Sequence, residues 1–128
     1  MSALSILLLT KIVGTFFPVA APLLVLSKER IDQLSGFQAS DSTLYRLYGM
    51  ALLALLVGYA GGLLEVQRGE FPAGVIVMGI VSNGGAFIVM LMTGRARQTP
   101  IAAGFFGLIC IGLIASGLMA EAAVTPLW

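Results

Sequence analysis

The chain has 128 residues, of which 59% are hydrophobic and 10% are charged, and its mean hydropathy is +1.02. Soluble proteins carry about a quarter charged residues, so this composition excludes a soluble globular domain and predicts an integral membrane protein in contact with the lipid bilayer. The net charge of +1 gives no support for a nucleic-acid partner. The chain has no histidine and its single cysteine, Cys110, cannot form an intrachain disulfide, so we expect no metal site and no cofactor.

Four windows of the sequence are long and apolar enough to cross a hydrocarbon core of about 30 Å, which requires roughly 20 helical residues. These windows cover residues 4–26, 44–67, 72–93 and 100–122. The first helix is expected to continue past the membrane to residue 35, before Gly36 ends it. The sequence therefore predicts an all-α polytopic membrane protein, a single transmembrane domain over residues 1–128 with its four helices in an antiparallel bundle.

The first window is interpreted as a retained helix rather than a cleaved secretory signal. No basic side chain precedes its apolar region, and Lys11 interrupts that region. The cleavage-like site Val19-Ala20-Ala21 would also be followed by Pro22, which signal peptidases reject. We therefore count residues 4–26 as the first membrane span.

Two prolines, Pro18 and Pro22, lie inside this first helix. Because proline has no backbone N–H, we expect the helix to bend or loosen near the middle of the membrane. With Phe16 and Phe17 beside the bend, one interpretation is an opening that admits an acyl chain or a quinone tail. The other interpretation is a simple kink that a neighbouring helix fills.

Short polar connections separate the four windows. Asp41 or Ser42 is expected to cap the second helix, and Pro72 and Thr99-Pro100 are expected to open the third and fourth. Aromatic side chains near the helix ends are expected to anchor the protein at the membrane–water interfaces. These anchors are Tyr45, Tyr48 and Trp128.

Basic residues indicate the orientation, because cytoplasmic loops of membrane proteins are enriched in Lys and Arg. The connections 27–47 and 94–99 lie on the same side of the membrane. They hold Lys28, Arg30, Arg46, Arg95 and Arg97, whereas the turn on the opposite side holds Arg68. We therefore expect both of these connections in the cytoplasm and both termini outside it.

In each predicted helix, small residues lie on the same face as the most polar side chain. Helices in lipid associate through small residues that allow close approach, so these faces are expected to point into the bundle. The glycines expected to mediate packing are Gly58, Gly62, Gly79, Gly107 and Gly117. The polar side chains on the same faces are Lys11, Glu65, Asn83 and Glu121.

Lys11, Glu65 and Glu121 are predicted to converge near the outer leaflet, with Glu65 as the preferred partner of the lysine. A hydrogen-bonded ion pair would lower the cost of keeping Lys11 charged. Asn83 is more central and is expected to link two helices by a hydrogen bond. Two other interpretations stay open: interfacial carboxylates with a lysine that reaches the surface, or a cluster that serves catalysis or ion translocation.

Two short motifs lie at helix ends: Leu44-Tyr45-Arg46-Leu47-Tyr48-Gly49, an Arg-x-x-Gly start of the second helix, and Thr93-Gly94-Arg95 after the third. Together with a first helix that ends near prolines, this order of features resembles the DoxX-like families, small bacterial membrane proteins of four helices. The resemblance covers nearly the whole chain and implies a four-helix fold in a bacterial inner membrane. Relatives in these families have been linked to sulfur-compound oxidation and oxidative-stress complexes, but no catalytic set carries over.

The sequence-based hypothesis for function is a small non-catalytic membrane subunit that associates with a larger membrane complex or with itself. Abundant small residues and short connections favour it. The alternative is a small carrier or binding protein for a lipid, a quinone or another apolar molecule, which the paired prolines and their aromatic neighbours favour. An enzyme ranks third, because no carboxylate pair or other reactive set can be assembled from the sequence.

Overall fold

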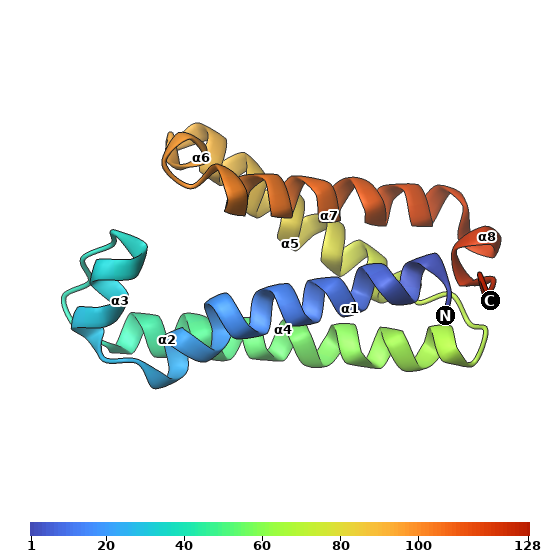
Figure 1. Ribbon diagram of the computed structural model, residues 1–128, viewed down its shortest axis with the longest axis horizontal. Coiled ribbons are helices and arrows are strands. Elements are labelled where there is room, and N and C mark those ends of the chain that lie inside the picture. The colour runs from blue at the N-terminus through green and yellow to red at the C-terminus, as the bar shows by residue number, and fades with distance from the viewer. The chain divides into compact units, whose positions relative to one another are not determined.

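The computed structural model describes residues 1–128 and is all-helical, with no strands, so the predicted all-α class is confirmed (Figure 1). The elements in chain order are α1 (Ala3–Thr15), η1 (Phe16–Ala20, a π-helix), α2 (Ala21–Val25), α3 (Lys28–Ser35), α4 (Thr43–Gln67), α5 (Ala73–Met92), α6 (Arg95–Gln98), α7 (Pro100–Leu118) and α8 (Ala120–Val124). They form two compact units. The terminal unit comprises Met1–Leu9 and Gly62–Trp128, and the central unit comprises Thr10–Gly61.

Four helical segments are long and apolar enough to cross a membrane, which confirms the number of spans predicted from the sequence. They are Ala3–Val25, Thr43–Gln67, Ala73–Met92 and Pro100–Leu118. Most residues of each span are not buried inside the protein. Their exposed apolar surface identifies an integral membrane protein in contact with lipid.

In the terminal unit, α5 packs along α7 in the opposite direction. A Cβ on Gly117 would lie 3.7 Å from Ile76, one on Gly107 would lie 3.4 Å from Phe87, and one on Gly84 would lie 3.2 Å from the Cys110 sulfur. Residue numbers rise along α5 as they fall along α7, so the two helices are antiparallel. At each of these contacts a glycine leaves room for a side chain of the facing helix.

The two ends of the chain lie side by side in the terminal unit (Figure 1). Ser2 and Pro126 form an isolated antiparallel bridge, and the backbone N–H of Leu127 donates to the carbonyl of Met1 over 3.0 Å. The Ser2 hydroxyl also caps α1, accepting from the Ser5 N–H over 3.1 Å. Both termini therefore lie on one side of the membrane, as an even number of spans requires.

The turn between α4 and α5 has the hydrogen bonds of a Schellman motif. Gly69, at φ 79°, donates to the Val66 carbonyl over 3.0 Å, and Glu70 donates to the Glu65 carbonyl over 3.0 Å. The left-handed conformation at Gly69 reverses the chain within a few residues. After the turn, α5 packs against α4 at the point where Gly62 of α4 faces Val75 of α5.

The fourth span is shorter than the predicted window of 100–122. Met119 leaves the helical conformation, at φ −123° and ψ 48°, so α7 ends at Leu118 and a separate short helix, α8, follows. This change of direction buries Ala123 and brings Pro126 to its bridge with Ser2. At the other end, α7 begins at Pro100 with Thr99 before it, as expected.

In the central unit, the first helix does not continue to residue 35 as the sequence predicted. Leu26 and Ser27 are extended, with ψ 157° and 156°, so α2 ends at Val25 and α3 begins anew at Lys28. The Ser27 hydroxyl caps α3 by accepting from the Arg30 N–H over 3.5 Å. Gly36, at φ 68°, ends α3 as predicted, and its N–H donates to the Asp32 carbonyl.

A small apolar core holds α2, α3 and the start of α4 together. Its buried members are Leu23, Ile31 and Tyr45, one from each helix, and Leu52 and Val19 pack against them. A Cβ on Gly49 would lie 2.9 Å from Leu24, so α4 also approaches α2 closely. At the start of α4, the Asp41 carboxylate accepts from the Thr43 N–H over 2.7 Å, which fulfils the capping role expected of Asp41 or Ser42.

Candidate functional site

The break between α2 and α3 is held by the side chain of Arg46, in the first turn of α4. Its Nη1 donates to the Leu23 carbonyl over 2.7 Å, and its Nη2 donates to the Leu26 carbonyl over 2.8 Å. In a continuous helix these carbonyls would accept from the backbone N–H groups of residues 27 and 30. The guanidinium therefore replaces the helical hydrogen bonds that are lost where the chain turns, and places a positive charge at the carboxyl end of the first span.

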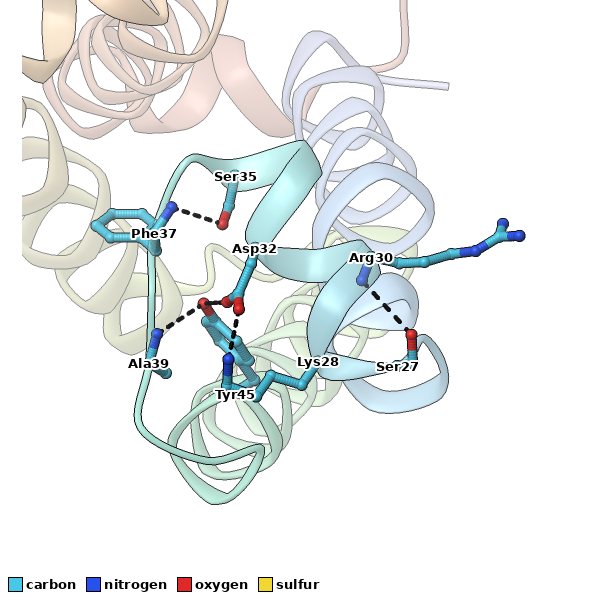
Figure 2. Close-up of polar contacts among 8 residues, drawn as sticks. All are labelled: Ser27, Lys28, Arg30, Asp32, Ser35, Phe37, Ala39 and Tyr45. Atoms are coloured by element: carbon cyan, nitrogen blue, oxygen red, sulfur yellow. Dashed lines mark hydrogen bonds and ion pairs between the residues drawn. The ribbon is translucent and has the colours of Figure 1, made fainter.

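The Asp32 carboxylate lies at the centre of a second polar group, which we name the Asp32 cluster: Lys28, Asp32, Ala39 and Tyr45 (Figure 2). The Tyr45 hydroxyl donates to Oδ1 of Asp32 over 2.5 Å, and Nζ of Lys28 donates to Oδ2 over 2.5 Å. The Ala39 N–H donates to the Tyr45 hydroxyl over 3.4 Å. The cluster thus ties α3, the following loop and the start of α4 together.

Within the Asp32 cluster, Asp32 and Lys28 each favour the charged form of the other side chain. The hydrogen bond from Lys28 and then that from Tyr45 lower the pKa of the Asp32 carboxyl below its usual value. The hydrogen bond to Asp32 raises the pKa of Lys28 in turn. Asp32 is therefore an ionised acceptor whose oxygens are already engaged by donors from its own chain, an arrangement that fixes α3 in place.

The sequence assigns Arg46 and Tyr45 other roles. Arg46 belongs to the motif at the start of the second helix and to the basic residues that indicate orientation, and Tyr45 is predicted to be an interfacial anchor. Tyr45 is instead buried, with 6% of its surface exposed, whereas Tyr48 and Trp128 are exposed. Neither Asp32 nor Lys28 was a candidate, because their spacing matches an ordinary exposed helical ion pair and nothing in it indicates the contact with Tyr45.

The first span contains a π-helical turn, η1, where the sequence predicted a bend or local loosening at its prolines. The Ala21 N–H bonds to the Phe16 carbonyl, five residues back, because Pro18 and Pro22 interrupt the regular donors. Phe16 and Phe17 make an edge-to-face contact with ring centroids 5.2 Å apart. Phe17 and Pro18 are exposed, whereas Pro22 is half-buried.

The residue before this turn carries a buried hydroxyl. Thr15 is 3% exposed, and its Oγ1 has no hydrogen-bond partner. A buried polar atom without a partner costs free energy, so such atoms often mark a functional position. The sequence carries no signal for Thr15, because a threonine in a membrane helix normally bonds to a carbonyl of its own helix.

The polar residues predicted to lie within the membrane have different surroundings. Lys11 is buried, with 6% of its surface exposed, and Glu65 is half-buried near the end of α4. Asn83 is 1% exposed and its Nδ2 donates to the Gly79 carbonyl in the same helix over 2.7 Å. Glu121 was wrongly placed in the fourth span: it lies in α8, beyond the end of α7, and is exposed. A pairing of Lys11 with a carboxylate stays a prediction.

The glycines predicted to mediate packing also differ in their surroundings. Gly62 faces the Val75 side chain, Gly107 faces Phe87, and Gly117 faces Ile76 at ordinary contact distance. Gly79 is buried and Gly58 is half-buried. Gly49, Gly84 and Gly112 also contact neighbouring helices closely. The sequence does not distinguish these three as packing positions, because glycine is abundant on every face of the spans.

No family model, curated protein or solved structure matches this chain. The structure contains no group of three or more His, Cys, Asp and Glu side chains that could hold a metal ion.

Proposed function

We propose that this protein is a small non-catalytic integral membrane subunit, which associates with a larger membrane complex or with further copies of itself. The observation that carries this proposal is a set of glycines on open faces of the spans. Apart from its own chain neighbours and the adjacent backbone of its own helix, a Cβ added at any of them would have no atom within 4 Å. They are Gly61 in α4, Gly74 and Gly85 in α5, and Gly104 in α7.

These open glycines differ from their immediate neighbours. Gly62 and Gly84, next to Gly61 and Gly85, each face a side chain of an adjacent helix, where the added Cβ would lie 2.9 Å and 3.2 Å from the nearest atom. Packing within the chain therefore explains Gly62 and Gly84 but does not explain Gly61 and Gly85. Glycine in a membrane helix permits close approach of a second backbone, which gives the open glycines a role in association.

One stripe of exposed residues along α7 supports the same proposal. Its members recur at alternating intervals of three and four residues, the spacing by which helices pack in left-handed pairs. They are Ile101, Gly104, Leu108, Ile111, Ala115 and Leu118, and Ile114 and Gly117 beside the stripe are exposed as well. Small residues among larger apolar ones on this face would let a partner helix interdigitate with α7.

We further propose that the four spans form an antiparallel bundle in a bacterial inner membrane, as in the DoxX-like families that the chain resembles. The connections 27–47 and 94–99 lie in the cytoplasm because they carry five of the six basic residues in the connections, and both termini lie outside.

Purification from native membranes in mild detergent, followed by native mass spectrometry, tests the proposal. We expect the chain in a defined complex with a second protein or with itself. Gly85→Leu, which adds bulk on an open face, should deplete that complex while leaving the helix content and thermal stability unchanged. Gly61→Leu provides an independent second variant. A wild-type chain that is recovered alone under several mild conditions would contradict the proposal.

A second candidate function is the binding of a lipid, a quinone or another apolar molecule at the first span. The widened turn at η1, the exposed Phe17 and the partnerless hydroxyl of Thr15 favour it. A carbonyl or hydroxyl of a bound molecule would supply the hydrogen bond that Thr15 lacks. Mass spectrometry of the gently purified protein should then detect a retained small molecule that Thr15→Val reduces. Recovery without any such molecule would remove this candidate.

A further inference from the structure

We infer that α3 is an interfacial helix, which lies along the surface of the bilayer with Leu34 and Phe37 inserted at the boundary between headgroups and acyl chains. The surface it binds is the membrane itself. This inference needs the membrane spans, but it does not depend on whether the chain associates with other subunits.

The position of α3 in the chain brings it to the bilayer. It begins at Lys28, directly after the first span ends at Val25, and its loop leads into the next span at Thr43. Within the central unit, α3 runs across the direction of α2 and α4 (Figure 1). Because α2 and α4 belong to spans that cross the membrane, a helix across them runs along the membrane plane.

The apolar side of α3 faces the spans and extends past them. Ile31 packs into the core with Leu23 and Tyr45, which belong to the two spans. Leu34 follows Ile31 by three residues and so lies on a neighbouring part of the same side, yet 75% of its surface is exposed. Phe37, just after the helix, is 54% exposed. The opposite side carries the exposed polar residues Glu29 and Gln33.

The apolar surface of α3 continues that of the spans. Val25, the last residue of the first span, is 78% exposed, and Leu44, in the first turn of the next span, is 65% exposed. These side chains contact lipid as part of the membrane-spanning surface. Leu34 and Phe37 extend the same kind of surface to the level of the headgroups, which is where an amphipathic helix lies when it binds a membrane.

The polar contacts of the central unit hold α3 in this orientation without help from lipid. Asp32 is bonded to Lys28 and Tyr45, and Arg46 closes the break before the helix. Residues 26–42 carry two basic and three acidic side chains, a net charge of −1. Burial of the apolar side chains of Leu34 and Phe37 therefore binds α3 to the surface, and attraction to anionic headgroups does not contribute.

Tryptophan fluorescence of the purified full chain in phosphatidylcholine vesicles tests this inference. The native tryptophan is removed by Trp128→Phe, and single tryptophans are introduced by Leu34→Trp, Phe37→Trp and the control Gln33→Trp. Gln33 is adjacent to Leu34 but lies on the polar side of α3. Quenching is measured with phosphatidylcholine that is brominated on its acyl chains near the headgroup, and with acrylamide in the aqueous phase.

We expect brominated lipid to quench the Leu34→Trp and Phe37→Trp chains about twofold or more and the Gln33→Trp chain weakly, with the opposite order for acrylamide. Addition of anionic phosphatidylglycerol to the vesicles should leave this pattern unchanged. Strong acrylamide quenching at all three positions would place α3 in water. Quenching by neither reagent at Leu34→Trp and Phe37→Trp would mean that protein covers them. Either result would overturn the inference.

Discussion

At the scale of single residues, Arg46 shows how one side chain allows a membrane helix to end where the sequence itself is still compatible with a helix. Residues 23–35 contain no glycine or proline, so nothing in them blocks a continuous helix. The break requires new donors for the carbonyls of Leu23 and Leu26, and the two nitrogens of the guanidinium provide them. The planar, forked geometry of arginine suits two acceptors at once.

Arg46→Met should therefore lower the free energy of unfolding in detergent by about 2 kcal/mol, because two backbone carbonyls lose a charged donor. Arg46→Lys should cost less, since an ammonium group can still reach one carbonyl. The control is Arg97→Met, an exposed arginine in α6, which should change stability by less than about 0.5 kcal/mol. Equal effects of the Arg46→Met and Arg97→Met substitutions would show that the two hydrogen bonds contribute nothing.

Asp32 makes the stability of the protein depend on pH in the acid range. Its pKa is lowered in the folded state by hydrogen bonds from Lys28 and Tyr45, so the folded state binds the proton less tightly than the unfolded state does. The contribution of Asp32 is complete above the usual carboxyl pKa of about 3.9 and is lost as the pH falls through the lower folded value. The melting temperatures of the wild-type chain and of Asp32→Asn should therefore converge as the pH is lowered from about 5 to about 2. A difference in melting temperature that stays constant over this pH range would show that the Asp32 carboxylate does not contribute to stability through its charge.

At the scale of elements, the glycines of α4 provide a direct comparison between an occupied and an open face. Gly62→Leu forces a side chain into the space that Val75 fills, whereas Gly61→Leu enters open space. We expect Gly62→Leu to destabilise the fold by about 1–3 kcal/mol through overpacking, and Gly61→Leu to leave the unfolding of the isolated chain nearly unchanged. Equilibrium unfolding in detergent measures both. Equal stability of the two variants would mean that α4 and α5 separate without cost.

The π-turn in the first span lies where the sequence predicts a disturbed helix, but its π-helical form is visible only in the structure. Pro18 and Pro22 predict a disturbed helix, because each proline removes one backbone donor. They do not predict its form. The chain keeps its helical course by widening one turn, with a bond from Ala21 to Phe16, and leaves the Thr15 hydroxyl buried without a partner.

At the scale of the whole molecule, the bridge between Ser2 and Pro126 fixes both termini on one side of the membrane, and the basic connections predict that this side is outside. A reporter enzyme that is active only in the cytoplasm should be inactive when fused after Trp128. The same reporter inserted after Gln38, in the loop that follows α3, should be active and serves as the control. Activity at the first position and not at the second would reverse the orientation.

The sequence by itself determined the class of the protein and its four spans. Backbone N–H and C=O groups must be hydrogen-bonded inside lipid, and long apolar helices satisfy this requirement for a chain of such composition. It also determined helix ends that depend on local chemistry, such as Gly36 and Thr99-Pro100. Only the tertiary structure decided where the first and fourth helices break. Those breaks depend on contacts between residues far apart in the chain: Arg46 with Leu23 and Leu26, and Pro126 with Ser2. The same holds for the Asp32 cluster, since local spacing alone does not reveal which distant donor a carboxylate meets.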